Sequence, residues 1–203
     1  MDECEKMKLE ERVRQLFGDS IETKIAAADE LSPKIAAAGQ KLAQCLLSDG
    51  KILVCGNGGS STNAQHFCCD LLNQFEAERP SLPAFSLSHD AATITSICND
   101  HHFDQVFAKQ INALGHENDL LMVITSSGNS DNIINAVNAA NDRGMDTIAL
   151  TGRDGGVLAN HLGPEDVEIR VASESKARIH EIHLLILHCF CDLIDKTLFG
   201  QFS

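Results

Sequence analysis

Two glycine-rich turns that carry hydroxyl groups are the residues in this chain best suited to chemistry. The first, at residues 55–61, reads Cys-Gly-Asn-Gly-Gly-Ser-Ser, and the second, at 125–130, reads Thr-Ser-Ser-Gly-Asn-Ser. Each follows a short apolar run and opens into a segment with helical spacing. Free backbone N–H groups and the positive end of a helix dipole therefore point at one spot. Two such turns predict a site for a phosphate and the sugar attached to it.

Each turn alone is also compatible with an ordinary tight loop in which Ser60 or Ser130 caps the next helix. Both turns at strand ends in one chain favour a ligand site. Neither turn matches a common nucleotide-binding pattern. The first lacks the third glycine and the acidic residue of the dinucleotide fingerprint, and the lysine of the phosphate-binding loop is absent.

Histidine and carboxylate side chains form the second group with chemical potential. His66 and Asp70 are four residues apart in the segment after the first turn, so they share one helix face. His180 and His188 share a face of a C-terminal helix, about 12 Å apart along its axis. These groups suit Zn²⁺, and they could equally transfer protons without a metal.

Five short apolar runs must position these groups. They lie at 52–55, 83–87, 120–125, 147–150 and 167–171. Segments with helical spacing alternate with them, at 61–75, 91–97, 104–114, 130–143, 155–162 and 175–198. This alternation predicts an α/β fold with a five-stranded parallel sheet flanked by helices. Ligands of such sheets bind at the carboxyl ends of the strands, where both turns lie.

The first 48 residues predict a separate helical segment, and residues 49–203 the α/β domain. Two helices are expected, Leu9–Leu31 and a second that runs to about Leu47, with Ser32 as N-cap and Pro33 in its first turn. Their faces rich in Ala and Leu exceed what one small sheet can cover. We therefore expect these helices to pack against other subunits of an oligomer.

The charge, apolar runs and cysteines of the chain argue against a nucleic-acid-binding, membrane-spanning or disulfide-bonded protein. The 203 residues carry a net charge of −13, which opposes binding to nucleic acid or to anionic membranes. The charged start of the chain predicts no signal peptide, and no apolar run approaches the ~18 residues that a membrane span needs. The eight cysteines form no Cys-x-x-Cys pair, so we expect them reduced and mostly buried, as in a cytoplasmic protein.

Taken together, the motifs resemble the sugar isomerase (SIS) family, and within it the sedoheptulose 7-phosphate isomerases, also called phosphoheptose isomerases. The resemblance rests on residues 55–60, 64–67 (Ala-Gln-His-Phe), 99–100 (Asn-Asp), 125–130, 150–156 (Leu-Thr-Gly-Arg-Asp-Gly-Gly) and 177–183 (Ala-Arg-Ile-His-Glu-Ile-His). It implies a flavodoxin-like SIS fold and a homotetramer. It also implies conversion of sedoheptulose 7-phosphate to D-glycero-D-manno-heptose 7-phosphate, in the synthesis of lipopolysaccharide heptose.

The resemblance also implies roles for single residues. Substrate is expected to contact Asn57, Gly58, Gly59, Ser60, Asn99, Asp100, Thr125, Ser126, Ser127, Ser130 and His180. One Zn²⁺ per subunit is expected on His66, Asp70, His180 and His188. Asp70 and His188 are expected to be the acid–base pair of a ketose–aldose isomerisation through an enediol. The family usually has glutamate at position 70, glutamine at 180 and arginine at 74, where this chain has Asp, His and Gln.

Three other segments, at 78–84, 162–170 and 191–199, resemble a second SIS family, the DnaA initiator-associating proteins. Those homotetramers bind the replication initiator DnaA and are not known for catalysis. They have serine at position 70 and asparagine at 188, so their acid–base set is absent. Because function depends on the site, the isomerase is the leading hypothesis. A scaffold that docks the initiator through Leu198-Phe199 is the alternative, and a sugar-phosphate sensor without turnover is a third.

Overall fold

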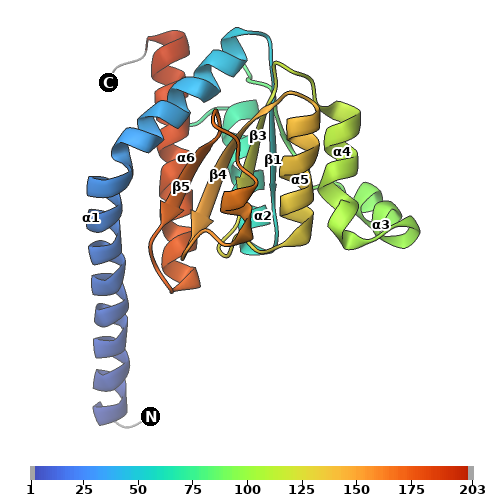
Figure 1. Ribbon diagram of the computed structural model, residues 1–203. Coiled ribbons are helices and arrows are strands. Elements are labelled where there is room, and N and C mark those ends of the chain that lie inside the picture. The colour runs from blue at the N-terminus through green and yellow to red at the C-terminus, as the bar shows by residue number, and fades with distance from the viewer. Residues whose placement is uncertain (1–2, 201–203) are drawn as a thin grey trace.

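A five-stranded, all-parallel sheet forms the centre of the computed structural model, which describes residues 3–200 (Figure 1). Its strands are β1 (Ile52–Gly56), β2 (Ala84–Ser86), β3 (Leu120–Ile124), β4 (Asp146–Gly152) and β5 (Val167–Val171). They are arranged in the order β2-β1-β3-β4-β5. β1 and β3 are buried along their whole length, which is why their sequences are continuous apolar runs. The predicted fold class is confirmed.

Helices cover both faces of the sheet (Figure 1). One face carries α1 (Glu3–Leu47), α2 (Gly59–Leu72) and α6 (Lys176–Phe199), and the other carries α4 (Val106–Leu114) and α5 (Asp131–Asp142). Smaller elements are α3 (Ala91–Asp100) and the 3₁₀ turns η1 (Phe103–Gln105) and η2 (Val157–Asn160). None of the helices within residues 3–200 is long and apolar enough to span a membrane.

One predicted helix, at 155–162, is wrong. Only the 3₁₀ turn η2 forms there. Gly155 and Gly156, at its start, have φ angles of 84° and 61°, which are incompatible with a right-handed helix.

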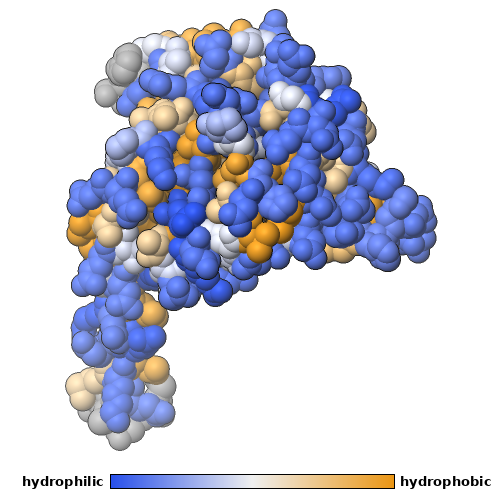
Figure 2. Space-filling view, viewed as in Figure 1, coloured by the Kyte–Doolittle hydropathy of each residue, from blue (hydrophilic) through white to orange (hydrophobic). Residues whose placement is uncertain are grey.

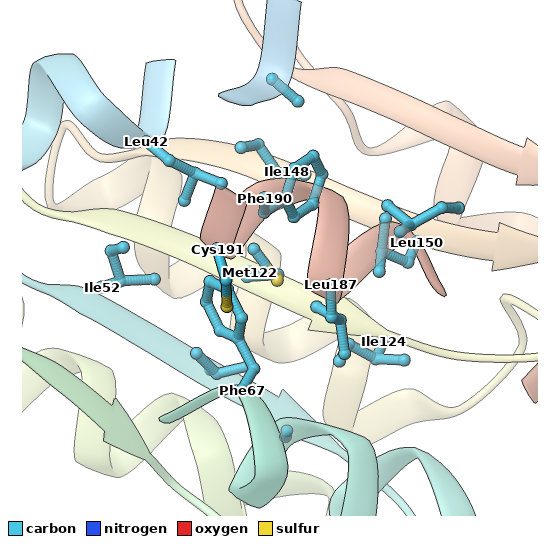
Figure 3. Close-up of a cluster of buried hydrophobic side chains, with 14 of the residues drawn as sticks. Leu42, Ile52, Phe67, Met122, Ile124, Ile148, Leu150, Leu187, Phe190 and Cys191 are labelled. Atoms are coloured by element: carbon cyan, nitrogen blue, oxygen red, sulfur yellow. The ribbon is translucent and has the colours of Figure 1, made fainter. Parts of the chain in front are cut away.

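Side chains from alternate strand positions fill two separate cores. Met122 and Ile124 of β3 point toward α2 and α6, where Phe67 and Phe190 meet edge to face with ring centroids 6.5 Å apart (Figure 3). Val123, between them in sequence, points toward α4 and α5. Burial of each large apolar side chain stabilises the fold by about 1.5–3 kcal/mol. The first core therefore holds α2 and α6 firmly on one face of the sheet.

The expected break between two N-terminal helices is wrong, because α1 is one helix of 45 residues with Pro33 inside it. Ser32 is not an N-cap, and its hydroxyl donates to the Ala28 carbonyl at 2.5 Å. Leu31 and Leu42, on either side of Pro33, are both buried in the first core. Their burial opposes the ~3 kcal/mol that an interior proline costs. Figure 1 shows the remaining effect, a bend that leaves the N-terminal half of α1 projecting past the sheet.

Close packing of α1 against α6 predicts that Gly39→Ala lowers the free energy of unfolding by about 1–3 kcal/mol. A Cβ atom at Gly39 would lie 2.6 Å from Leu193 Cδ1 and 3.2 Å from Leu193 Cβ. Gly18→Ala in the same helix is the matched control, since nothing lies within 4 Å of its Cβ position. Helix propensity alone should raise its stability by up to ~1 kcal/mol. Equal effects in urea denaturation would contradict the close contact at Gly39.

Candidate active site

The two glycine-rich turns lie side by side because β1 pairs with β3. Gly56, the last residue of β1, is in register with Ile124, the last residue of β3. The chain then enters α2 on one face of the sheet and α5 on the other. The two turns therefore lie at the carboxyl ends of β1 and β3, the position where sheets of this topology bind ligands.

The first turn is shaped for close approach of another group to its backbone. Gly58 is the N-cap of α2 and has a φ of 56°. A Cβ at Gly59 would lie 2.5 Å from His180 Cε1, so His180 of α6 lies directly against this turn. Ser60 is buried inside the first turn of α2 and does not cap the helix.

The second turn presents several hydroxyl groups at the start of α5. The buried Thr125 Oγ1 accepts from the backbone N–H of Gly128 at 3.2 Å, which makes Thr125 an organiser of the turn. Ser126 and Ser127 are half-buried. Ser130 is the N-cap residue of α5, yet its side chain forms no capping hydrogen bond. Capping alone therefore does not account for these hydroxyls.

The segment after β4 is hydrogen-bonded to the second turn. Leu158 N donates to the Gly128 carbonyl at 2.9 Å, and Val157 N donates to Asn129 Oδ1 at 2.9 Å. Gly128 has a φ of 66°, and a Cβ there would lie 1.8 Å from the Gly155 carbonyl oxygen. The glycines at 155–156, which the sequence showed only as part of a motif, are needed for this contact.

A pair of amides, which the sequence did not reveal, joins the two turns. Asn57 Nδ2 donates to Asn132 Oδ1 and Asn132 Nδ2 donates to Asn57 Oδ1, both at 2.9 Å. Asn132 is buried in the first turn of α5. The only signal in the sequence was an asparagine two residues after Ser130. This reciprocal pair ties the first turn to the start of α5.

Three potential metal ligands converge between α2 and α6. Ligand atoms of His66, Asp70 and His188 all lie within 4.8 Å of one another. His66 Nε2 is 3.1 Å from His188 Nε2 and 3.3 Å from Asp70 Oδ2. Asp70 Oδ2 is buried and accepts no hydrogen bond from the described residues. The sequence expected these three together with His180.

His180 lies outside this trio, beside Gly59. Its Nε2 atom is buried with no hydrogen-bond partner among residues 3–200. Burial, followed by the nearby Lys176 charge, lowers the pKa of His180 and favours the neutral imidazole. His183, one turn further along α6, is a core residue. Burial lowers its pKa to about 4, and its Nε2 lies 2.9 Å from the Thr151 carbonyl oxygen.

Asn99 and Asp100 are not brought to the trio within one chain. They are exposed at the end of α3, where Asn99 Nδ2 donates to Asp100 Oδ1 at 2.9 Å. α3 packs with the α4 and α5 side of the sheet, away from α6 (Figure 1). Contact between these two residues and a ligand of the trio stays a prediction.

Known proteins with the same arrangement identify the family. A model of the SIS domain matches residues 17–152. The phosphoheptose isomerase of Halorhodospira halophila is 59% identical over 190 residues, which cover 94% of this chain and 96% of that protein. This chain belongs to the phosphoheptose isomerase family of SIS-domain proteins. The phosphoheptose isomerase of Chromohalobacter salexigens is 54% identical over 195 residues, 96% of this chain and 99% of that protein.

Solved structures of the phosphoheptose isomerase family share this fold over nearly the whole chain. The Francisella tularensis phosphoheptose isomerase is 51% identical with a TM-score of 0.89, covering 92% of this chain and 97% of that one. The Neisseria gonorrhoeae phosphoheptose isomerase is 46% identical with a TM-score of 0.88, covering 93% and 99%. The long N-terminal helix and the parallel sheet are thus features of the family.

Because the amide pair ties the two turns together, Asn132→Ala is expected to weaken sugar-phosphate binding. It leaves Asn57 without its partner, so the free energy of unfolding should fall by about 1–3 kcal/mol. Asn138→Ala is the control on the same helix, since Asn138 is exposed and its Oδ1 lies 3.0 Å from His161 Nδ1, away from the turns. Calorimetric titration should show weaker binding for the first variant alone. Equal affinities would mean that the amide pair does not shape the site.

Proposed function

We propose that this protein isomerises sedoheptulose 7-phosphate to D-glycero-D-manno-heptose 7-phosphate. The observation that carries the proposal is the convergence of His66, Asp70 and His188 between α2 and α6. The glycine-rich turn that begins α2 lies beside the second, hydroxyl-rich turn. Helix α2 therefore begins beside the candidate phosphate site and carries two of the three proton-transfer groups, His66 and Asp70. The names of the relatives, all phosphoheptose isomerases, support the same activity.

Local dipoles and hydroxyls hold the substrate phosphate in this proposal. Ser126, Ser127 and Ser130 lie at the N-terminus of α5, where backbone N–H groups and the helix dipole favour a dianion. The net charge of −13 makes such local donors necessary, because no broad basic field attracts the substrate. The sugar then extends toward Gly58, where nothing lies within 4 Å of the Cβ position, and toward His180, which lies against Gly59.

Two tautomerisation steps, each moving protons on carbon and on oxygen, complete the isomerisation. A base removes a proton from C1 of the ketose while the C2 carbonyl oxygen gains a proton, which gives an enediol. C2 then gains a proton and the C1 hydroxyl loses one, which gives the aldose. Asp70 and His188 are the acid–base pair, one from each helix. Positioned groups of this kind typically accelerate a reaction by 10²–10⁴-fold.

Zn²⁺ fits the trio, since two imidazoles and one carboxylate are ligands that it prefers. The buried Asp70 Oδ2, which accepts no hydrogen bond from the described residues, is an atom that a cation would satisfy. His66, Asp70 and His188 would hold the ion, and His180 is the candidate for a fourth ligand. When bound, zinc would polarise the substrate carbonyl as a Lewis acid. Zinc on Asp70 would lower the basicity of its carboxylate, so the roles of Asp70 as metal ligand and as base would compete.

Asp70→Asn and His188→Asn are each expected to lower turnover of sedoheptulose 7-phosphate by about 10²-fold or more. Affinity for the substrate should change little, because the turns are untouched. His116→Asn is the control, since His116 is exposed and precedes β3 at the opposite end of the sheet. Coupled assays with and without a chelator separate proton transfer from metal dependence. A wild-type protein that shows no turnover with zinc supplied would refute the isomerase proposal.

We further propose a homotetramer assembled through the projecting half of α1. Large apolar side chains recur along it at helical spacing, and orange patches appear on this segment in Figure 2. Those at least half exposed are Met7, Leu9, Val13, Phe17, Ile21 and Ile25. An apolar stripe on a helix that leaves its own domain is typical of an interface between subunits.

Light scattering should give about four times the 22.0 kDa chain mass. Phe17→Asp is expected to dissociate the assembly, because it places a charge in the apolar stripe, where Phe17 is 67% exposed in the single chain. Lys24→Asp, on an exposed polar position of the same helix, serves as the control for added negative charge. A wild-type monomer at micromolar concentration would exclude the tetramer.

Binding of the replication initiator DnaA through Leu198-Phe199 stays a prediction from the sequence. Leu198 and Phe199, the expected docking end, pack partly buried against the first core. The trio that the initiator-associating proteins lack is complete here. Catalysis is therefore the function that the site supports best, and a cytoplasmic location is its expected setting.

A further inference from the structure

Asp70 lies in the last turn of helix α2, close to the C-terminus of the helix. It is two residues from Leu72, the last residue of α2, so the carbonyl groups of this turn need donors from beyond it. Asn73 N donates to the Cys69 carbonyl and Leu82 N to the Leu71 carbonyl, both at 3.0 Å. The last turn of α2 contains no basic residue. Helix ends fray, and fraying here would move the Asp70 carboxylate away from His188 on the other helix. A donor to the Asp70 carbonyl itself would oppose such fraying.

Arg79 is that donor. Its side chain is 1% exposed and reaches back from the loop to the end of α2. Its guanidinium donates to the carbonyl of Asp70 at 2.7 Å and to the carbonyl of Leu71 at 2.6 Å. A cation at a helix C-terminus also interacts favourably with the helix dipole. The backbone of Asp70 is thus held directly by the Arg79 side chain.

The same guanidinium also binds α6. Arg79 Nε donates to Asp195 Oδ1 at 2.9 Å, and the Asp195 side chain is only 11% exposed. Asp195 follows His188 by seven residues, about two helical turns, so both project from one face of α6. One planar group therefore connects the residue that carries one half of the acid–base pair to the helix that carries the other half.

We propose that Arg79 and Asp195 are positioning residues of the isomerase, which fix the distance between Asp70 and the imidazole of His188. This inference rests on the function proposed above. Neither residue contacts the substrate in this proposal, and both act through the placement of α2 against α6. Residues that orient a ligand set in this way typically change activity by 10–100-fold when they are replaced.

Asp195→Ala tests the proposal. kcat for sedoheptulose 7-phosphate should fall about tenfold or more, while KM changes less than about threefold, because the phosphate turns are untouched. Asp195→Glu, which keeps the carboxylate, should recover most of the lost kcat. If Asp195→Ala does not fold, Asp195→Asn keeps the acceptor atom and should give a smaller fall in kcat.

The matched control is Asp119→Ala. Asp119 is also a buried carboxylate in an ion pair, with Lys51, but it lies before β3 at the opposite end of the sheet. Its loss should lower thermal stability as the loss of Asp195 does, with kcat unchanged. Equal kcat values for the two variants would overturn the proposal and leave Arg79–Asp195 as a purely structural pair.

NMR spectroscopy tests the positioning role of Arg79 and Asp195 independently of any isomerase activity. NMR spectra of the imidazole ring protons report the surroundings of His66 and His188 without substrate or metal. These resonances should shift in Asp195→Ala and stay at the wild-type positions in Asp119→Ala. Absence of turnover in the wild type would refute the isomerase proposal. Unshifted histidine resonances in Asp195→Ala would overturn the positioning role, whether or not the wild type is active.

Discussion

The pairing of β1 with β3 is the constraint on which the rest of the site depends. Parallel strands in register end at the same edge of the sheet, so the turns after Gly56 and Ile124 must be neighbours. The helices after them diverge to opposite faces of the sheet. Asn57 and Asn132 then connect the first turn to the start of α5 with two hydrogen bonds. Topology brings the groups together, and a single polar pair joins them.

The contact between α2 and α6 extends this arrangement to the proton-transfer groups. Phe67 and Phe190 anchor the two helices in the apolar core, and Arg79 with Asp195 joins their far ends. Buried polar atoms in proteins are nearly always hydrogen-bonded. Among residues 3–200, two of the exceptions are Asp70 Oδ2 and His180 Nε2, and both lie in the candidate site. Unsatisfied atoms at these positions are consistent with a site built for a ligand.

Helix α1 combines two surfaces with different roles. Its C-terminal half buries Leu31 and Leu42 in the core and crosses α6 at Gly39, where only a hydrogen atom fits. Its N-terminal half leaves the domain with apolar side chains facing solvent in the single chain. The two halves form one continuous, bent helix, because burial around Pro33 outweighs the helix-breaking effect of the proline.

The sequence by itself determined the fold class, the five strands and the position of both turns. Periodicity reports burial directly, and the motifs of the phosphoheptose isomerase family are local in sequence. It also placed His66 and Asp70 on one face, since their spacing of four is a helix property. The family resemblance added both His188 and His180 to this pair, and tertiary structure alone separated them, with His188 beside the pair and His180 against Gly59. The hydrogen bonds of Asn132 and Arg79 are likewise visible only in the tertiary structure. Those contacts join residues distant in the chain through packing angles and loop paths, which no local pattern encodes. The continuity of α1 through Pro33 belongs to the same class, because burial on both sides of the proline overrides a local signal.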